Sequence, residues 1–512
     1  MNTVINNTNI RTILISLLLT LCIYIVYGYQ LGLEDGPEFL PFAKVIQNPF
    51  LYKNDLFVKS MLAMPWNERT IFGLFFSMFE SLEWAGFIVH VILTFFLVLG
   101  VFKLSEVILK DFWWSLLLTL IYFLITLQIE IGSTTLYYHN IQGETFANTF
   151  IIWALVALVY QREKLTFLLI GLATYFHALI GFQSFLFITS AYLLYMLYNK
   201  DFETLKIIIY CILVYIITCS WIIVMIFMGN QSEGIGSSKE FMDLTYHFSL
   251  KCHFDPLAFS RKGYILFLIS LIAGFNFYKK QQPLVFFTFI TLSAGYVIYL
   301  IGFYVNSYLI TSSWWFRTNM WVMVLGQIAG MGLLKNISLI NKFRYLLFAT
   351  VFIAIGFKIT WRTEIPKMYP WNDLALENDE VKTAFACKKY SKIDDVFIHP
   401  LTFSALKYFG ERASYVEYNR YVRSKKDIKV WYNRLGEVYR LNTSIETARN
   451  PDFNNLNNEN YNNLKDSQLT ILADKGVKYA IFSADHSSKF PCIYSNKSYK
   501  IIQIKNIELS PL

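Results

Sequence analysis

The feature that most constrains this chain is a series of long apolar segments between Ile13 and Trp361, separated by short polar connectors. A helix of about 20 apolar residues is long enough to cross a bilayer core. Only 16% of the residues are charged, whereas a soluble domain averages about 25%. From Arg362 onward, Lys, Asp, Glu and Asn become frequent. The sequence therefore predicts a polytopic α-helical membrane protein with a water-soluble tail, and it excludes a soluble single-domain enzyme, a disordered protein and a disulfide-stapled mini-domain.

The apolar segments predict about eleven spans, with the fifth and sixth nearly fused around Gly181. The predicted spans start near Ile13, Phe72, Phe112, Thr145, Leu165, Gln183, Leu205, Gly263, Pro283, Trp314 and Tyr345. This reading divides the chain into a membrane domain, 1–361, with long outer loops at 31–70 and 229–262, and a soluble domain, 362–512. The first span lacks a small-x-small cleavage site and is read as a retained helix rather than a signal peptide.

The connectors give the orientation, because cytoplasmic loops of membrane proteins carry an excess of Lys and Arg. With the N-terminus in the cytoplasm, most basic connector residues fall inside, and the short loops after Glu130, Ala178 and Tyr304 fall outside. An odd number of spans then places the tail outside the cytoplasm. There Cys387 and Cys492 could pair in an oxidising compartment, or they could remain two thiols; the sequence leaves both readings open.

The tail alternates helical and strand-like segments, which favours an α/β fold. Expected helices include Glu377–Tyr390 and Thr402–Phe409, and the apolar runs Asp395–His399 and Val477–Ser483 read as strands. The stretch Asn450–Asn463 has few apolar anchors and is predicted to be a loop. The formal net charge of +9 is explained by basic inner loops, and no basic cluster interleaved with aromatic residues indicates nucleic acid as a partner.

The first outer loop holds the strongest candidates for chemistry. Glu34, Asp35 and Glu38 follow the first span directly, and carboxylates at a membrane surface need a partner or a function. The Gly36–Pro37 turn would hold Glu34 and Asp35 at the mouth of the helix. An acidic pair can serve as a general base or bind a metal; alternatively, it caps the helix that begins at Pro37. The following segment is amphipathic enough to lie along the membrane interface.

Three other polar residues are expected at the outer face. Arg317 follows Trp314 and Trp315 at a span end and is a candidate for binding a phosphate group bidentately; the alternative is an Arg that snorkels to lipid headgroups or pairs with Glu34 or Asp35. His139 and His177 are candidates for substrate binding, although a His in an apolar stretch is more often a structural hydrogen-bond donor.

Several stretches resemble the GT-C superfamily of membrane glycosyltransferases, and more narrowly an uncharacterised group of bacterial polytopic proteins within it. They are EDGPEF at 34–39, NPFLYKNDLF at 48–57, GLATYFHALIGF at 171–182, and DDVFIHP at 394–400 followed by WYNRL at 431–435. The resemblance implies many spans, an inner N-terminus, an extracytoplasmic C-terminal domain and location in the bacterial cytoplasmic membrane. It further implies a polyprenyl-phosphate-linked sugar donor and a catalytic acid in the first outer loop, here Glu34 or Asp35.

The chain also departs from better understood members of that superfamily. It lacks a WWD triplet in the tail, which disfavours an Asn-x-Ser/Thr acceptor, and the second outer loop has no clear Asp-x-Asp but contains His139 and Glu144. No motif for a divalent metal is clear, so metal dependence and the acceptor stay open. The leading hypothesis is an inverting glycosyltransferase; the alternatives are a non-catalytic membrane assembly protein and a lipid-linked glycan polymerase or transporter.

The leading hypothesis predicts one groove at the outer membrane surface, enclosed by the two long outer loops and the tail. Its floor would carry Glu34 and Asp35, and Arg317 would lie across it at a distance that a sugar phosphate spans. A lowered dielectric at this boundary strengthens both the acid and the phosphate-binding group. A direct salt bridge between Arg317 and an acid is the structural alternative.

Overall fold

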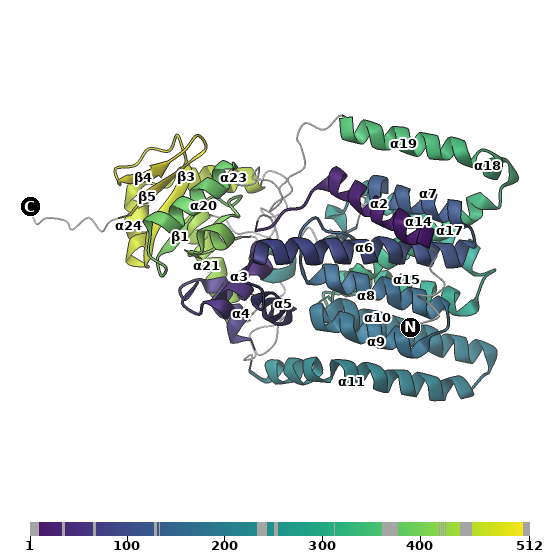
Figure 1. The fold of residues 1–512 in the computed structure, drawn as a ribbon. Coiled ribbons are helices and arrows are strands. Elements are labelled where there is room, and N and C mark those ends of the chain that lie inside the picture. The colour runs from purple at the N-terminus through teal and green to yellow at the C-terminus, as the bar shows by residue number, and fades with distance from the viewer. Residues whose placement is uncertain are drawn as a thin grey trace, which may run out of the picture. The chain divides into compact units, whose positions relative to one another are not determined.

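A computed structural model of the chain gives the fold (Figure 1). It describes residues 10–504 apart from gaps at 33–35, 65–67, 127–130, 133, 233–242, 250–253, 312, 361–376, 419, 421, 423, 425 and 441–452. Contacts divide the chain into two compact units, each made of three segments. The membrane unit comprises Met1–Tyr29, Phe87–Val224 and Cys252–Pro366. The loop-and-tail unit comprises Gln30–Gly86, Met225–Lys251 and Lys367–Leu512.

The membrane unit is a bundle of helices that run side by side (Figure 1). Its elements are α2 (Ile10–Tyr27), α6 (Leu82–Leu109), α7 (Phe112–Ile121), η1 (Tyr122–Thr126), α8 (Gly143–Val159), α9 (Glu163–Phe176), α10 (Ala178–Asn199), α11 (Glu203–Ser232), η3 (Pro256–Ala258), α14 (Arg261–Tyr278), α15 (Pro283–Tyr304), α16 (Tyr308–Thr311), η4 (Trp315–Arg317), α17 (Thr318–Lys335), α18 (Ser338–Lys342) and α19 (Arg344–Thr360). The chain is therefore mostly helical, as the sequence predicts.

Five helices in the described residues are long and apolar enough to cross a membrane: α2, α6, α10, α11 and α15. Two more apolar helices, Phe112–Thr126 and Gly143–Val159, are shorter. Each of the eleven predicted segments contains a helix, but only these five meet the requirements for a span. The second predicted start is wrong, because Phe72 lies in another helix and the long apolar helix begins at Leu82. Large apolar side chains such as Ile217 and Ile272 are exposed along the bundle, as lipid contact requires.

Local sequence determines where several of these helices begin. Asp111 caps α7 by accepting hydrogen bonds from the backbone N–H groups of Trp113 and Trp114. Ser260 caps α14 in the same way, and Pro283 occupies the first turn of α15, where its missing N–H costs nothing. Helices α14 and α17 then approach so closely that a Cβ atom on Gly326 would lie 2.3 Å from the Cβ of Ser270. A small residue at this position is what allows the two backbones to meet.

The loop-and-tail unit contains a small mixed sheet with the strand order β2-β1-β3-β5-β4. Strands β1, β2 and β3 are parallel, and β5 runs antiparallel to both β3 and β4. The strands are β1 (Val396–Ile398), β2 (Ala413–Ser414), β3 (Val477–Ser483), β4 (Cys492–Ser495) and β5 (Tyr499–Gln503). The helices are α3 (Gly36–Gln47), α4 (Leu56–Ala63), α5 (Glu68–Ser77), η2 (Asp243–Ser249), α20 (Asp379–Tyr390), η6 (Leu406–Gly410), α21 (Ile428–Tyr439), α23 (Phe453–Asn462) and α24 (Asp466–Asp474).

The helices of the first outer loop belong to the same unit as the sheet. Phe42, Tyr52, Phe57 and Met61 form part of one buried apolar cluster between α3 and α4. The Tyr52 hydroxyl donates to the backbone carbonyl of Lys407, 355 residues away in sequence. Distant segments of the chain thus fold together here, so the first loop forms part of the tail's structure.

One prediction for the tail is wrong, because the Asn-rich stretch at 450–463 contains the helix α23. Its inner face does have anchors: Tyr461 is fully buried, and its hydroxyl donates to the carbonyl of Ile481 on β3. The side chain of Asn458 accepts a hydrogen bond from the backbone N–H of Leu401. Asparagine thus contributes here by forming a hydrogen bond with the backbone of a neighbouring segment. A prediction based only on the number of apolar residues misses this contribution. Cys387 is buried, Cys492 is exposed, and both are free thiols.

Candidate functional site

The candidate site in the membrane unit begins with Glu144, in the first turn of α8. The loop 131–142 leads into this helix, and Gln142 in extended conformation is its N-cap residue. Acidic residues are favoured in a first turn because they face the positive end of the helix dipole. Glu144 is nevertheless only 8% exposed. A buried carboxylate needs charged or hydrogen-bonding partners, and two of them come from other helices.

His177 separates α9 from α10, which otherwise read as one apolar stretch. Its backbone is extended, and its Nδ1 atom accepts a hydrogen bond from the backbone N–H of Ile180, so that the imidazole caps α10. Because Nδ1 acts as an acceptor, the ring proton lies on Nε2. The buried Nε2–H lies 3.2 Å from Oε1 of Glu144 and donates to it.

Arg317 is the third member of the site and lies in the short helix η4. Its Nη1 atom lies 3.3 Å from Oε1 of Glu144 and 2.9 Å from Nε2 of His177. Since Nε2 carries a proton, both groups direct donors at the same carboxylate oxygen. The guanidinium lies 4.7 Å from the ring centre of Trp314, which is buried and has a positive φ of 52°. A bulky residue in this backbone region is uncommon and often marks a functional site.

Several polar atoms near this cluster are buried and have no hydrogen-bond partner in the described part of the chain. They are Nε of Arg317, Oε2 of Glu144, Nε2 of Gln142, Oγ1 of Thr145, Oδ1 of Asn148 and Oδ1 of Asn319. Buried polar groups in proteins are nearly always hydrogen-bonded. The cluster therefore offers both donors and acceptors to a polar ligand, with a guanidinium among the donors. Such a mixture suits hydroxyl groups, which donate and accept, together with an anion that Arg317 can bind.

The structure brings together two of the predicted site residues, Arg317 and His177, and adds Glu144. Arg317 therefore pairs with an acid of the second outer loop. The sequence shows Glu144 in that loop, but nothing in its spacing pairs it with residues 33 and 173 positions away. His139 is half-buried in the loop 131–142 that leads to Glu144.

The remaining predicted residues belong to the first outer loop. Glu38 lies in α3 and forms an ion pair with Arg69, whose side chain is fully buried. The Nε atom of Arg69 also donates to the backbone carbonyl of Glu38 at 3.1 Å. Arg69 therefore holds both the carboxylate and the backbone carbonyl of Glu38. Glu34 and Asp35, which would form the floor of the predicted groove, lie outside the described residues.

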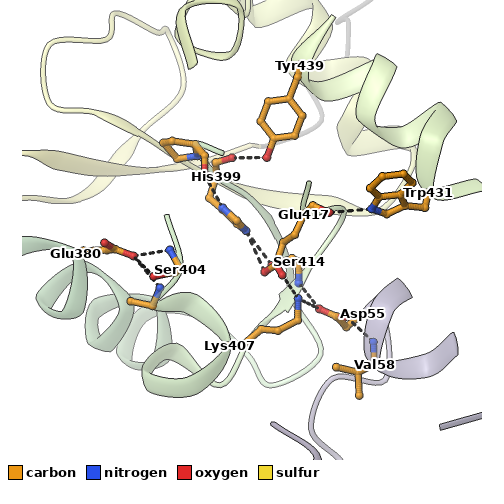
Figure 2. Close-up of polar contacts among 12 residues, drawn as sticks. Asp55, Val58, Glu380, His399, Ser404, Lys407, Ser414, Glu417, Trp431 and Tyr439 are labelled. Carbon is orange, nitrogen blue, oxygen red and sulfur yellow. Dashed lines mark hydrogen bonds and ion pairs between the residues drawn. The ribbon is translucent and has the colours of Figure 1, made fainter. Parts of the chain in front are cut away.

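A second polar cluster lies inside the loop-and-tail unit, beside the carboxyl ends of β1 and β2 (Figure 2). The Lys407 ammonium group lies 3.0 Å from Oδ2 of Asp55 and 2.7 Å from Oε2 of Glu417. Asp55 also accepts hydrogen bonds from the backbone N–H groups of Val58 and Ser414. Burial alone would raise the pKa of Glu417, but the ammonium of Lys407 and its other cationic and hydrogen-bonding neighbours lower it far below its usual range.

His399 completes this second cluster, and its contacts argue against nucleophilic catalysis. Its Nδ1 lies 2.9 Å from the carbonyl of Pro400, whereas Oγ of Ser414 and Oε1 of Glu417 both lie near Nε2, at 3.0 and 3.3 Å. A Ser-His-acid triad places the acid on one ring nitrogen and the serine on the other. Ser414 is also buried and donates to Glu417. The cluster therefore joins the first loop to the sheet by a saturated network.

The described residues contain no group of three or more His, Cys, Asp or Glu side chains arranged to hold a metal ion. The fold and the site define a mostly helical membrane protein with a small C-terminal sheet and a buried Arg-His-Glu cluster among its helices. No protein-family model matches the chain, and no curated protein sequence matches it significantly.

Proposed function

We propose that this protein is a membrane glycosyltransferase that moves a sugar from a polyprenyl-phosphate-linked donor to an acceptor. The observation that carries the proposal is the Arg317 cluster: a guanidinium among apolar helices, oriented by Glu144 and His177, with a buried Nε that has no partner in the described part of the chain. A lipid-linked sugar phosphate presents hydroxyl groups, an anion and an apolar chain. The cluster and the surrounding apolar bundle supply a matching chemistry for each of them.

Arg317 would bind the phosphate of the donor and stabilise the negative charge that grows on it as the sugar departs. Glu144 holds one side of the guanidinium and is itself held by the Nε2–H of His177, which leaves the Nε–H of Arg317 for the phosphate. Low dielectric surroundings strengthen this contact. The pairing with Glu144 also keeps the cluster close to neutral when no phosphate is present, so the buried Arg does not require an external anion.

The reaction also needs a base, and the acidic pair Glu34 and Asp35 of the first outer loop is the proposed source. One of these carboxylates would accept the proton of an acceptor hydroxyl, while the oxygen of that hydroxyl attacks the anomeric carbon from the face opposite the phosphate. The bond from the anomeric carbon to the phosphate oxygen breaks, and the polyprenyl phosphate leaves with the electron pair. The configuration at the anomeric carbon is inverted.

The setting of the reaction belongs to the same proposal. The chain would cross the bacterial cytoplasmic membrane about eleven times, with the shorter apolar helices counted as spans, and its N-terminus would be cytoplasmic. The loop-and-tail unit would then lie outside the cytoplasm, where the acceptor arrives from water. Excess Lys and Arg in the assigned inner connectors support this orientation.

The proposal is tested with membranes that contain the full-length protein and a radiolabelled lipid-linked sugar. Arg317→Lys keeps the charge but removes the planar fork, and loss of a charge-assisted hydrogen bond of about 1.5–3 kcal/mol predicts a fall in sugar consumption of roughly 10–150-fold. Arg344, whose guanidinium donates to the hydroxyl of the adjacent Tyr345 and lies over its ring, provides the control Arg344→Lys, which should keep full activity.

The base is tested separately with Glu34→Ala, Asp35→Ala and the double variant. At least one single variant should lose most turnover, and the double variant should lose it entirely. Full turnover in all three variants would rule out the base assignment, and full turnover in Arg317→Ala would rule out the phosphate-binding role.

A further inference from the structure

His90 is a fully buried polar residue in the apolar helix α6, far in sequence from the Arg317 cluster. Ionisable side chains within apolar membrane helices are costly, and they usually have a specific partner or function. Within the described part of the chain, His90 forms hydrogen bonds with two groups, and these join three parts of the membrane unit. One goes to Tyr24 on α2, and the other goes to the loop 131–142.

The geometry of these contacts determines where the imidazole proton lies. Nε2 of His90 is 2.8 Å from the backbone carbonyl oxygen of Tyr138, which can only accept a hydrogen bond. Nε2 therefore carries the proton and donates it. Nδ1, at 2.5 Å from the Tyr24 hydroxyl, then has a lone pair and accepts from that hydroxyl. The rings of Tyr29 and Tyr137 lie 5.0 and 5.6 Å from the imidazole and limit its rotation.

The loop that His90 holds is the one that leads into the Arg317 cluster. Its first part is fixed by other groups, because Asn319 donates to the carbonyl of Ile131 and Asn148 donates to the carbonyls of Thr135 and Leu136. Tyr138 lies six residues before Glu144, closer to it than any of those three carbonyls. His90 therefore holds the backbone in the part of the loop that lies nearest the acid in sequence.

We infer that His90, oriented by Tyr24, is a positioning residue that holds the loop 131–142 so that Glu144 meets Arg317 and His177. The expected effect on phosphate binding rests on the proposed function, whereas the role of His90 in holding the loop does not. Loss of the Nε2–H contact would free the backbone near Tyr138, let Glu144 move away from Arg317, and loosen the orientation of the guanidinium. The alternative to a positioning role is that His90 is a buried side chain that only fills space between α2 and α6.

The test uses full-length protein in nanodiscs and three variants. His90→Leu keeps much of the volume but cannot donate, whereas His90→Gln retains an amide N–H that can reach the Tyr138 carbonyl. Tyr24→Phe keeps the donor of His90 and removes the hydroxyl that orients it. Amide hydrogen exchange of peptides covering 134–142 is measured together with the binding of decyl phosphate, an alkyl monophosphate without a sugar.

His90→Leu should speed exchange in the 134–142 peptides by about tenfold, the equivalent of one lost hydrogen bond, and weaken decyl phosphate binding severalfold. His90→Gln should restore both values to within about twofold of the wild type, and Tyr24→Phe should fall between the two variants. Exchange in α15, far in sequence from this loop, should stay unchanged in every variant.

Two results would overturn the inference: wild-type exchange in His90→Leu, or equal effects of the Leu and Gln substitutions. If wild-type protein does not bind decyl phosphate, the phosphate-binding role of the proposed function fails. The exchange measurement still decides the role of His90 in that case, so the two failures are distinguishable.

Discussion

Removal of the Lys407 charge should strongly destabilise the loop-and-tail unit. The side chains of Lys407 and Asp55 are each 1% exposed, and that of Glu417 is 11% exposed. Lys407→Met keeps the length and the apolar stem of the side chain. It removes the ammonium group, which lies 5.7 Å from the ring centre of Phe57, and leaves two carboxylates buried without their shared cation. Breaking a buried ion pair by removal of one partner costs about 3–5 kcal/mol.

This cost predicts a large change in thermal stability. A domain of 150–250 residues loses about 2–4 °C in Tm per kcal/mol, so Lys407→Met should lower the Tm of this unit by roughly 6–20 °C. The measurement is thermal unfolding of full-length protein in detergent, followed by tryptophan fluorescence and by tryptic cleavage of the tail. Trp431 is a useful reporter because its Nε1–H donates to the carbonyl of Glu417.

The matched control is Lys475→Met, which removes another lysine of the same unit. The Lys475–Glu437 pair is 2.6 Å long, but its side chains are 42% and 33% exposed, and such pairs contribute at most about 1 kcal/mol. A triple variant, Asp55→Asn, Lys407→Met and Glu417→Gln, should recover at least half of the lost stability, because it removes all three charges and retains an N-cap on α4. A Tm for Lys407→Met equal to that of the control would refute the reasoning.

Three further predictions concern pH, helix capping and helix packing. The pKa of Glu417 is lowered in the folded protein, so the stability that its carboxylate contributes should be complete above its unfolded pKa of about 4.3 and should disappear as the pH falls toward its folded pKa. Glu417→Gln should therefore reduce the fall of Tm at acidic pH, and an unchanged fall would contradict this. His177→Ala should cost at least about 1 kcal/mol because α10 loses its cap, whereas His177→Asn should keep the cap; thermal unfolding of both variants decides the point, and equal losses would show that the cap is unimportant. Gly326→Ala should destabilise the membrane unit by about 1–3 kcal/mol, because the new methyl group would overlap α14. In the control Gly356→Ala, on α19, the new methyl group meets nothing within 4 Å, so this variant should be neutral or more stable by up to about 1 kcal/mol. Comparable Tm values for the two variants would argue against close packing at Gly326.

The helices of the bundle could be predicted from the sequence because they depend on local apolar content. A helix occurs at each predicted segment, and the one clear error in position, at Phe72, arose because this residue belongs to a separate short helix, α5, that precedes the long one. The alternation in the tail was also visible, as β1 and β3 confirm. Strands β4 and β5 were missed, since their side chains are mostly half-exposed and give little apolar pattern.

The candidate site was predictable only in part. Arg317 and His177 are unusual residues in apolar surroundings, and that local contrast singled them out. Their partner Glu144 was visible in the second outer loop, but its pairing depends on how three separate helices pack. The pairing of Asp55 with Lys407 and Glu417 could not be predicted, because these are common surface residues in sequence and become buried only through contacts between distant segments.

The loop-and-tail unit is assembled from segments that lie far apart in the sequence, so the ribosome synthesises them at different times. Residues 30–86 leave the ribosome early, but their partner Lys407 and the strand β5 come more than three hundred residues later. At typical elongation rates of about 5–20 residues per second, the first loop waits roughly 15–80 s with part of its apolar cluster uncovered. A premature stop codon late in the message would therefore leave the most N-terminal loop without the surface against which it folds.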